Sequence, residues 1–134
     1  MEAASSSLTL RLLDRHRHEP EDALQQVALA VLQQEGIRDD SVLRAERIAA
    51  LAPPVAAMVM LAGWLAYVDW EGFDSALYAN IDAVAAFIAG ALDLPEAAAN
   101  LRQTRDAAVF EAQRPALALA LISLIERHIA LFPR

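Results

Sequence analysis

The sequence predicts an all-α fold, a compact bundle of six to seven helices with a central apolar helix near residues 55–68. Composition is the first reason, because 30 Ala and 20 Leu stand against only 8 Val, 7 Ile and 2 Thr, which favours helix over strand. The second is that apolar residues recur three and four positions apart, the repeat of an amphipathic helix. The third is that Pro and Gly separate these runs. Because 134 residues have room for one core, we expect 1–134 to form a single helical domain.

Two helices are predicted in the N-terminal third of the chain, over residues 7–17 and 21–35. Pro20 lies where the second begins, a position at which its missing N–H costs no helical hydrogen bond. Gly36 follows the second helix and is the usual residue at such an end. The apolar stripe of the second helix consists of Leu24, Val27, Ala28 and Val31.

The third and fourth helices are predicted over residues 42–51 and 55–68. Asp39, Asp40 and Ser41 offer N-caps for the third, and Pro53-Pro54 precedes the fourth. The apolar side of the third would consist of Val42, Ala45, Ile48, Ala49 and Ala52. The fourth has no polar face, so we expect it to lie at the centre of the bundle.

A membrane span is the alternative for the uncharged run of 21 residues from Ile48 to Val68. Pro53 and Pro54 interrupt this run and would break a helix there. Seven of its residues are Ala, which is only weakly hydrophobic, and no cluster of basic residues marks one side. We therefore predict a buried helix and no membrane association.

A connection is predicted over residues 69–74, before a fifth helix over 75–92. Asp74 is the expected N-cap of that helix. Phe73 and Tyr78 flank this cap with the spacing of a hydrophobic staple, in which the two side chains would pack together.

Two more helices complete the prediction, over residues 95–113 and 115–131. Asp93 and Glu96 have the spacing of a capping box at the start of the first. Pro115 either opens the last helix or kinks one continuous helix. Within 95–113, Arg102 and Asp106 are four positions apart and are expected to pair.

Negative charge is concentrated in the middle of the chain. The net charge is −7, and there is no basic residue between Arg47 and Arg102. That stretch contains six carboxylates, those of Asp69, Glu71, Asp74, Asp82, Asp93 and Glu96. Such a field repels nucleic acid phosphates and attracts basic proteins, so we expect a basic protein partner and no direct nucleic acid binding.

The candidate partner-binding site is the segment from Tyr67 to Asp74, which places three aromatic and three acidic side chains within eight residues. Its predicted binding residues are Tyr67, Asp69, Trp70, Glu71, Phe73 and Asp74. Aromatic side chains supply contact area at little entropic cost, and the carboxylates would steer a basic partner. The alternative is that this is a capped turn whose rings fold back into the core.

Signatures of catalysis, cofactors or metals are missing from the sequence. It has no Cys, no Gly-rich phosphate loop and no His pair with the spacing of a metal site. We therefore expect no cofactor and no metal. The sequence favours a protein that is not an enzyme. The first 13 residues lack the pattern of a signal peptide, and the missing Cys fits a cytoplasmic protein.

One short motif bears on catalysis. Arg11 followed by His16 resembles the R-x4-6-H motif of HEPN-type ribonucleases, which are small all-α dimers. The resemblance implies that His16 would act as the acid or base and that Arg11 would hold a phosphate. It covers six residues, and here they lie at the N-terminus, whereas in that family the motif is usually on a late helix.

The leading functional prediction is a small non-enzymatic interaction module, of the inhibitor, immunity or adaptor kind. It would dock a basic partner through its acidic, aromatic turn. The alternative is a helical subunit of a homo- or hetero-oligomeric complex, since a 57% hydrophobic composition can exceed what one small core buries. The HEPN-like ribonuclease that uses Arg11 and His16 is a third hypothesis.

Overall fold

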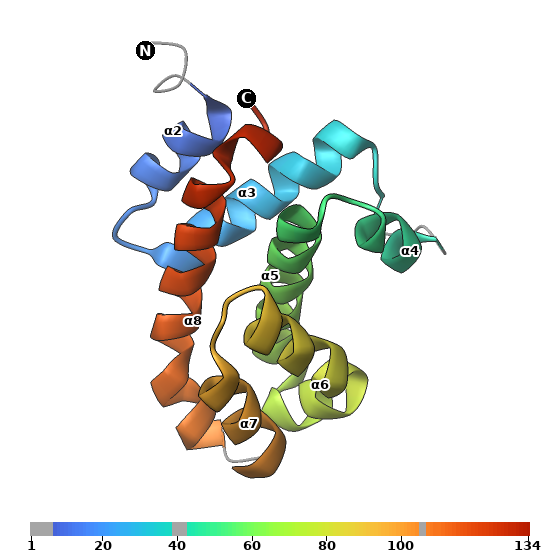
Figure 1. The fold of residues 1–134 in the computed structure, drawn as a ribbon, viewed down its shortest axis with the longest axis vertical. Helices are drawn as coiled ribbons and strands as arrows, with labels where there is room; N and C mark the ends of the chain where they lie inside the picture. Colours follow the sequence, from blue (N-terminus) through green and yellow to red (C-terminus); the bar gives the residue numbers. More distant parts are fainter. Residues whose placement is uncertain (1–6, 39–42, 105–106) are drawn as a thin grey trace.

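The computed structural model of the chain describes residues 7–38, 43–104 and 107–134, with side chains described outside 74–81, 83 and 100–104. These residues form seven α-helices and one 3₁₀ turn, and none of them lies in a strand, which confirms the all-α prediction (Figure 1). The elements are α2 (Leu8–Arg15), α3 (Pro20–Glu35), α4 (Arg44–Ala49), α5 (Pro53–Glu71), α6 (Phe73–Gly90), α7 (Pro95–Thr104), α8 (Ala107–Arg127) and η1 (Ile129–Leu131).

Helix α5 is the central helix, as the sequence predicts (Figure 1). It contacts α3, α4, α6 and α8, and most of its apolar side chains are buried, although Gly63 and Tyr67 are exposed on one face. Ten of its residues are buried: Val55, Ala56, Ala57, Met58, Val59, Leu61, Ala62, Trp64, Leu65 and Val68. Burial of each Val, Leu or Met side chain in this set contributes about 1.5–3 kcal/mol to the stability of the bundle.

Helix α3 begins and ends where the local signals predict. Pro20 is its first residue, and Gly36 closes it in the left-handed region with φ of 67°. Its stripe of Leu24, Val27 and Val31 is buried against the core, as predicted. The side-chain amide of Gln25 also donates a 2.7 Å hydrogen bond to the carbonyl of Ala62, which ties α3 to α5.

Helix α2 and the end of the chain lie together at one end of the molecule (Figure 1). The Ser7 side chain caps α2 by accepting a hydrogen bond from the amide of Leu10. Thr9 is fully buried, and its hydroxyl donates a 2.6 Å hydrogen bond to the carbonyl of Pro133. The residues that follow α8 are thereby fixed to the first described helix.

Helix α4 differs from the prediction. It is shorter than 42–51, and Ala45, Ala49 and Ala52 are exposed rather than directed into the core. The reason is that α4 touches the bundle mainly along α5, with Ile48 half-buried against the core. The guanidinium of Arg47 holds α4 in place by donating to the carbonyls of Glu35 and Gly36 at the end of α3. The predicted caps Asp39, Asp40 and Ser41 lie outside the described residues.

The connection predicted over 69–74 is wrong, because α5 continues to Glu71 and α6 begins at Phe73. Gly72 alone joins the two helices, with φ of 91°, a conformation that strains residues with a side chain. Asp74 is therefore the second residue of α6 and is not its N-cap. The side chains of Asp74 and Tyr78 lie outside the described part of the chain, and so does the predicted staple.

Helix α7 begins at Pro95, as predicted, but the predicted capping box at its start and the predicted boundary between residues 113 and 115 are wrong. Asp93 has φ of 55° and follows α6, while Leu94 precedes α7 and accepts the hydrogen bond from the amide of Ala98. Asp93 is therefore not the cap of a capping box with Glu96. Pro115 lies within α8, so its position supports the continuous-helix alternative. The predicted helix over 95–113 is divided between α7 and α8, and residues 105–106 between them lie outside the described part of the chain. Arg102 and Asp106 lie outside the described side chains.

Helix α8 is the one described helix that is long and apolar enough to cross a membrane by length and composition alone. In its most apolar window 39% of the residues are buried. The core helix of a soluble protein passes the same test, so this is weak evidence for a span. The run from 48 to 68 is divided between α4 and α5, with the break at Leu51 and Ala52 before Pro53, as the two prolines predict.

Candidate functional site

The end of α5 presents a ridge of exposed side chains. Val68 is the last buried residue of this helix, and from there it emerges from the core as far as Gly72. Tyr67, Trp70 and Glu71 are three and four positions apart, so they share one face of the helix. Trp70 is 86% exposed and Tyr67 is 41% exposed. We call these three residues the α5 ridge.

Phe73 does not belong to this surface. It is 8% exposed, and its ring stacks on that of Phe110 with a centroid distance of 4.8 Å and an interplanar angle of 13°. Trp64 meets the same Phe110 ring edge-on at 5.4 Å. The chain reverses at Gly72, which carries Phe73 back over the core beside α8. Phe73 was predicted to contact a partner. Its burial against Phe110 gives it a structural role instead.

Asp69 lies on another side of α5, where it takes part in an ionic cluster centred on Arg114 of α8. The guanidinium of Arg114 donates two hydrogen bonds to Glu21 of α3, from Nη2 to Oε1 at 2.6 Å and from Nε to Oε2 at 2.7 Å. Nη2 also donates to Oδ2 of Asp69 at 2.8 Å, and Nη1 lies 3.3 Å from Oε1 of Glu111. We call Glu21, Asp69, Glu111 and Arg114 the Arg114 cluster.

The Arg114 cluster joins three helices and keeps an excess of negative charge. The Arg114 side chain is 11% exposed, and its guanidinium lies 5.8 Å from the centroid of the Phe110 ring. Hydrogen bonding to Glu21 raises the pKa of Arg114, so its charge is permanent. One cation here faces three carboxylates, of which those of Asp69 and Glu111 are largely exposed. The cluster therefore holds three helices together and still attracts cations.

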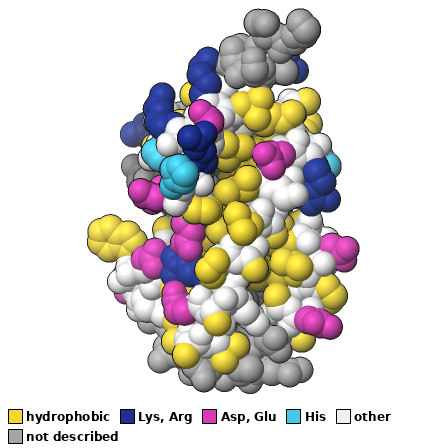
Figure 2. Space-filling view, turned by 90° about the vertical axis from the view of Figure 1, so that its left-hand side faces the viewer, with side chains coloured by type: hydrophobic (Ala, Val, Ile, Leu, Met, Phe, Trp, Pro, Cys, Tyr) yellow, Lys and Arg dark blue, Asp and Glu magenta, His cyan; other side chains and the backbone are white. Residues whose placement is uncertain are grey.

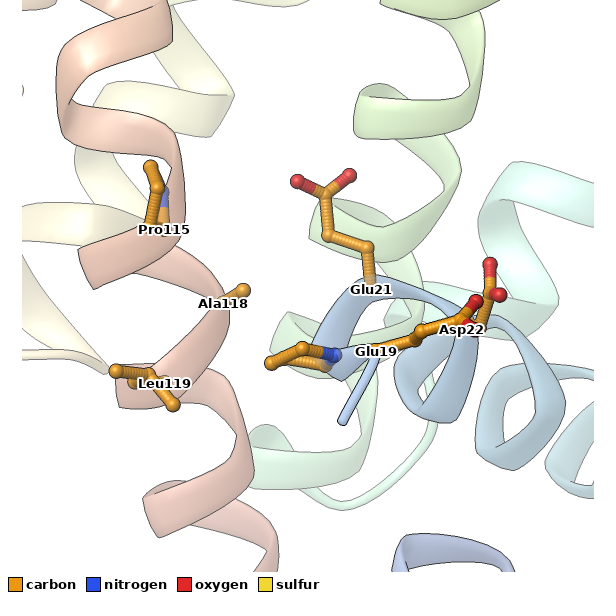
Figure 3. A pocket seen from close by; sticks show the side chains of 7 residues that line it. Glu19, Glu21, Asp22, Pro115, Ala118 and Leu119 are labelled. Atoms are coloured by element: carbon orange, nitrogen blue, oxygen red, sulfur yellow. The ribbon is translucent and has the colours of Figure 1, made fainter. Parts of the chain in front are cut away.

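A groove lies next to this cluster, between the first turn of α3 and the middle of α8 (Figure 3). Its volume is about 320 Å³. Its α8 side is apolar, and Figure 3 shows that the carboxylate ends of Glu19 and Asp22, at the start of α3, are directed away from α8. The groove is lined by Glu19, Pro20, Glu21, Asp22, Pro115, Ala118 and Leu119. We call it the α3–α8 groove.

Two carboxylates at the start of α3 lie side by side. Figure 3 shows the ends of Glu19 and Asp22 meeting each other, with Glu21 directed another way. A hydrogen bond with Asp22, together with repulsion by its charge, raises the pKa of Glu19 above its ordinary value. The Glu19 side chain is therefore in an environment where an added positive charge is favourable.

A second cavity adjoins the α5 ridge on the side of α4 and α6. It has a volume of about 300 Å³ and is lined by Arg44, Ile48, Val59, Met60, Gly63, Trp64, Tyr67 and Val84. Tyr67 thus borders this cavity, while Asp69 faces the Arg114 cluster. The segment 67–74 therefore does not place its predicted residues on a single surface, although Trp70 lies between these two sides.

The other sequence candidates gain no support from their placement. Arg11 is exposed on α2 and His16 is the half-buried residue that ends it. Five positions correspond to about 140° around a helix, so the two side chains do not share a face. Among the described residues there is no group of three or more His, Asp or Glu arranged to hold a metal ion.

The comparisons with known proteins give one result. Residues 7–109 match the family described as YfbN C-terminal domain. The chain belongs to this YfbN C-terminal domain family. No curated protein matches the chain, and no solved structure does. In this YfbN C-terminal domain the matched range includes Glu21, Asp69 and Trp70, and it ends before Phe110 and Arg114.

Sequence reasoning missed the Arg114 cluster and the α3–α8 groove. Glu21 and Arg114 are 93 positions apart, and no local pattern connects them. The acidic start of α3 has the ordinary appearance of a helix N-terminus, where carboxylates favour the helix dipole. Only the packing of α3 against α8 turns these residues into one site.

Proposed function

We propose that this protein is a non-enzymatic, cytoplasmic interaction module that docks a basic protein partner through the α5 ridge, as an inhibitor, immunity-type or adaptor protein would. The observation that supports this most is the exposure of Trp70, which is 86%. A tryptophan at a protein surface is the side chain most enriched among residues that dominate binding energy. No other large apolar side chain in the described part of the chain is as exposed.

Charge supports a basic partner. Glu71 belongs to the ridge, and Asp69 beside Trp70 is part of an ionic cluster with more carboxylates than cations. The whole stretch between Arg47 and Arg102 contains only negative charges. Complementary charge of this kind raises the rate of association and selects the orientation of the partner.

The test is a selection of random 16-residue peptides displayed on phage against the immobilised full chain. We expect the enriched peptides to carry net positive charge and at least one aromatic or aliphatic side chain. Trp70→Ala should weaken their binding at least about tenfold, the size of a moderate hot spot. Glu71→Lys should weaken it as well, by reversing the charge that the peptides recognise.

The matched control is Glu126→Lys, which makes the same change of charge at an exposed site in the last turn of α8. Residue 126 lies roughly 22 Å along the helix axis from Glu111, the member of the Arg114 cluster on the same helix. This distance is well beyond one Debye length. It should leave peptide binding unchanged. Enriched peptides without excess positive charge, or peptides that bind Trp70→Ala as tightly as the wild type, would contradict the proposal.

A second candidate function is a subunit of a homo- or hetero-oligomer, and exposed leucines favour it. Leu119 of α8 is 59% exposed, and Leu29 and Leu131 are each 49% exposed. A homo-oligomer predicts a mass by static light scattering that is a multiple of 14.5 kDa and falls with dilution. In that case Leu119→Glu should return the mass to that of a monomer. A mass of 14.5 kDa at every concentration excludes the homo-oligomer.

A further inference from the structure

The cavity of about 300 Å³ between α4, α5 and α6 is graded from an apolar floor to a polar mouth. We call it the α4–α5 cavity. Its floor is buried, since Val59, Trp64 and Val84 are each no more than 5% exposed. The other described lining residues are half-buried or exposed and therefore lie towards the mouth: Arg44, Ile48, Met60, Gly63 and Tyr67. Of the described residues that line this cavity, Arg44 alone carries a charge.

The cavity exists because α4 covers α5 without filling the space between them. Helix α4 has six residues, and none of them is buried. It is held by the hydrogen bonds from Arg47 to the end of α3 and by Ile48, which is half-buried against the core. The face of α5 beside it includes Met60, Gly63 and Tyr67, which are three and four positions apart.

Gly63 keeps part of this space open. It lies in the middle of α5, where glycine is less favourable than any residue except proline. A Cβ atom added at Gly63 would meet no other atom within 4 Å. Its backbone is helical, so neither the conformation of the chain nor a close neighbour requires glycine here. A larger side chain at this position would occupy space that the cavity now has.

We propose that the α4–α5 cavity binds a small amphipathic carboxylate, with the apolar body on the buried floor and the carboxylate group at Arg44. Burial of hydrocarbon on this floor is favourable, and a guanidinium binds a carboxylate through strong, paired hydrogen bonds. Arg44 has contacts within the chain, but a guanidinium has five N–H donors and can also hold a ligand. Tyr67 adds a phenol that can donate to the same group. The volume is at the lower end of ligand cavities, which favours a short apolar body.

The acidic surface of the Arg114 cluster lies on another side of the molecule. Figure 2 looks onto the α8 side and shows acidic side chains gathered around a basic one. In Figure 1, α8 lies on the left and α4 on the right, with α5 between them. A helix with its side chains is about 10 Å across, which exceeds the Debye length of about 8 Å at physiological salt. The carboxylates of the cluster are therefore screened from an anion at Arg44.

The experiment is a ¹H–¹⁵N NMR titration of the full chain with octanoate. The matched probe is octanamide, which has the same chain and nearly the same shape without the charge. The chain has two tryptophans, of which Trp64 lines the cavity and Trp70 does not. We expect a saturable shift of the Trp64 indole N–H signal, no shift of the Trp70 signal, and a Kd of about 0.1–1 mM for a ligand of this size.

Two comparisons of ligands separate the charge from the apolar body. Octanamide should bind about fivefold to tenfold more weakly than octanoate, because it lacks the hydrogen bond between two charged groups. Hexanoate should bind about tenfold more weakly, because it buries two fewer CH₂ groups.

Two variants locate the site, each with a matched control. Arg44→Met should lower the affinity for octanoate to that for octanamide, whereas Arg127→Met, the same change at an exposed site at the end of α8, should not. Gly63→Leu should abolish binding of both ligands. Gly90→Leu should not, since Gly90 is exposed on α6 and a Cβ there also meets no atom within 4 Å. Gly63→Leu removes a glycine from a helix, so urea unfolding should show no loss of stability.

Several results overturn the inference. Equal affinities for octanoate and octanamide do so with the wild-type chain alone, and so does octanoate binding that Gly63→Leu leaves unchanged. If the basic peptides from the selection shift the Trp64 indole signal and octanoate does not, a side chain of the partner occupies the cavity instead.

The α5 ridge is tested separately, because Trp70 does not line the cavity. Trp70→Ala should weaken binding of the selected peptides and leave octanoate binding unchanged. Failure of the peptide result alone removes the ridge proposal, and failure of the octanoate result alone removes the cavity proposal.

Discussion

Replacing Phe110 by alanine should lower the free energy of unfolding by about 3–5 kcal/mol, the usual cost of removing a buried phenylalanine. Phe110 is 1% exposed and its ring touches those of Trp64 and Phe73. It also lies beneath the guanidinium of Arg114. The substitution therefore leaves a cavity where α5, α6 and α8 meet. Urea unfolding followed by circular dichroism measures the change, which is a large part of the 5–15 kcal/mol typical of a small domain.

Trp70→Ala is the matched control for this substitution, because it also removes a large aromatic ring. Trp70 is exposed on the α5 ridge, so its loss should change stability by no more than about 0.5 kcal/mol. If both variants lose the same stability, or if Phe110→Ala loses less than about 1 kcal/mol, then Phe110 is not the packing centre that the structure indicates.

Replacing Arg114 by methionine should cost about 2–4 kcal/mol of stability. Methionine keeps much of the apolar volume and removes the charge, so that Glu21, Asp69 and Glu111 are left close together without a cation. Loss of one partner from a buried pair costs about 3–5 kcal/mol, and the partial exposure of the carboxylates reduces this figure. Urea unfolding at low and high salt measures it, and salt should recover part of the loss by screening the repulsion.

Arg17→Met provides the comparison, since Arg17 pairs with Asp14 where both side chains are exposed. This variant should lose at most about 1 kcal/mol. Adding Glu21→Gln to Arg114→Met should restore part of the lost stability, because it removes one of the carboxylates left without a partner. An Arg114→Met variant as stable as Arg17→Met would mean that the cluster contributes no more than an ordinary surface ion pair.

The sequence predicts the fold well where the signal is local. Helix α5 is recognisable as central because it is apolar on all sides, whatever its neighbours are. Pro20, Gly36 and Pro53 mark helix ends because each acts on the backbone within one turn. Local signals mislead where two of them compete. Asp74 has the residue type of a cap, but Gly72 ends α5 and reverses the chain two residues earlier.

The candidate site is predicted only in part. The aromatic and acidic composition of residues 67–74 is visible in the sequence, but it does not distinguish Trp70 from Phe73. Both have similar neighbours, yet one is exposed and the other is stacked on Phe110. Phe110, on which Phe73 stacks, is 37 positions further along the chain. The sequence does not predict where the helix of Phe110 lies relative to Phe73.

The sequence by itself determined the helical class, the central helix and the negative charge, because these depend on residue type and on spacing within a few positions. The tertiary structure alone decided which aromatic ring faces water, which carboxylates meet Arg114 and where the groove opens. Those properties depend on how α3, α5 and α8 approach one another. Their approach is set by the packing of the whole core, which no short stretch of the chain encodes.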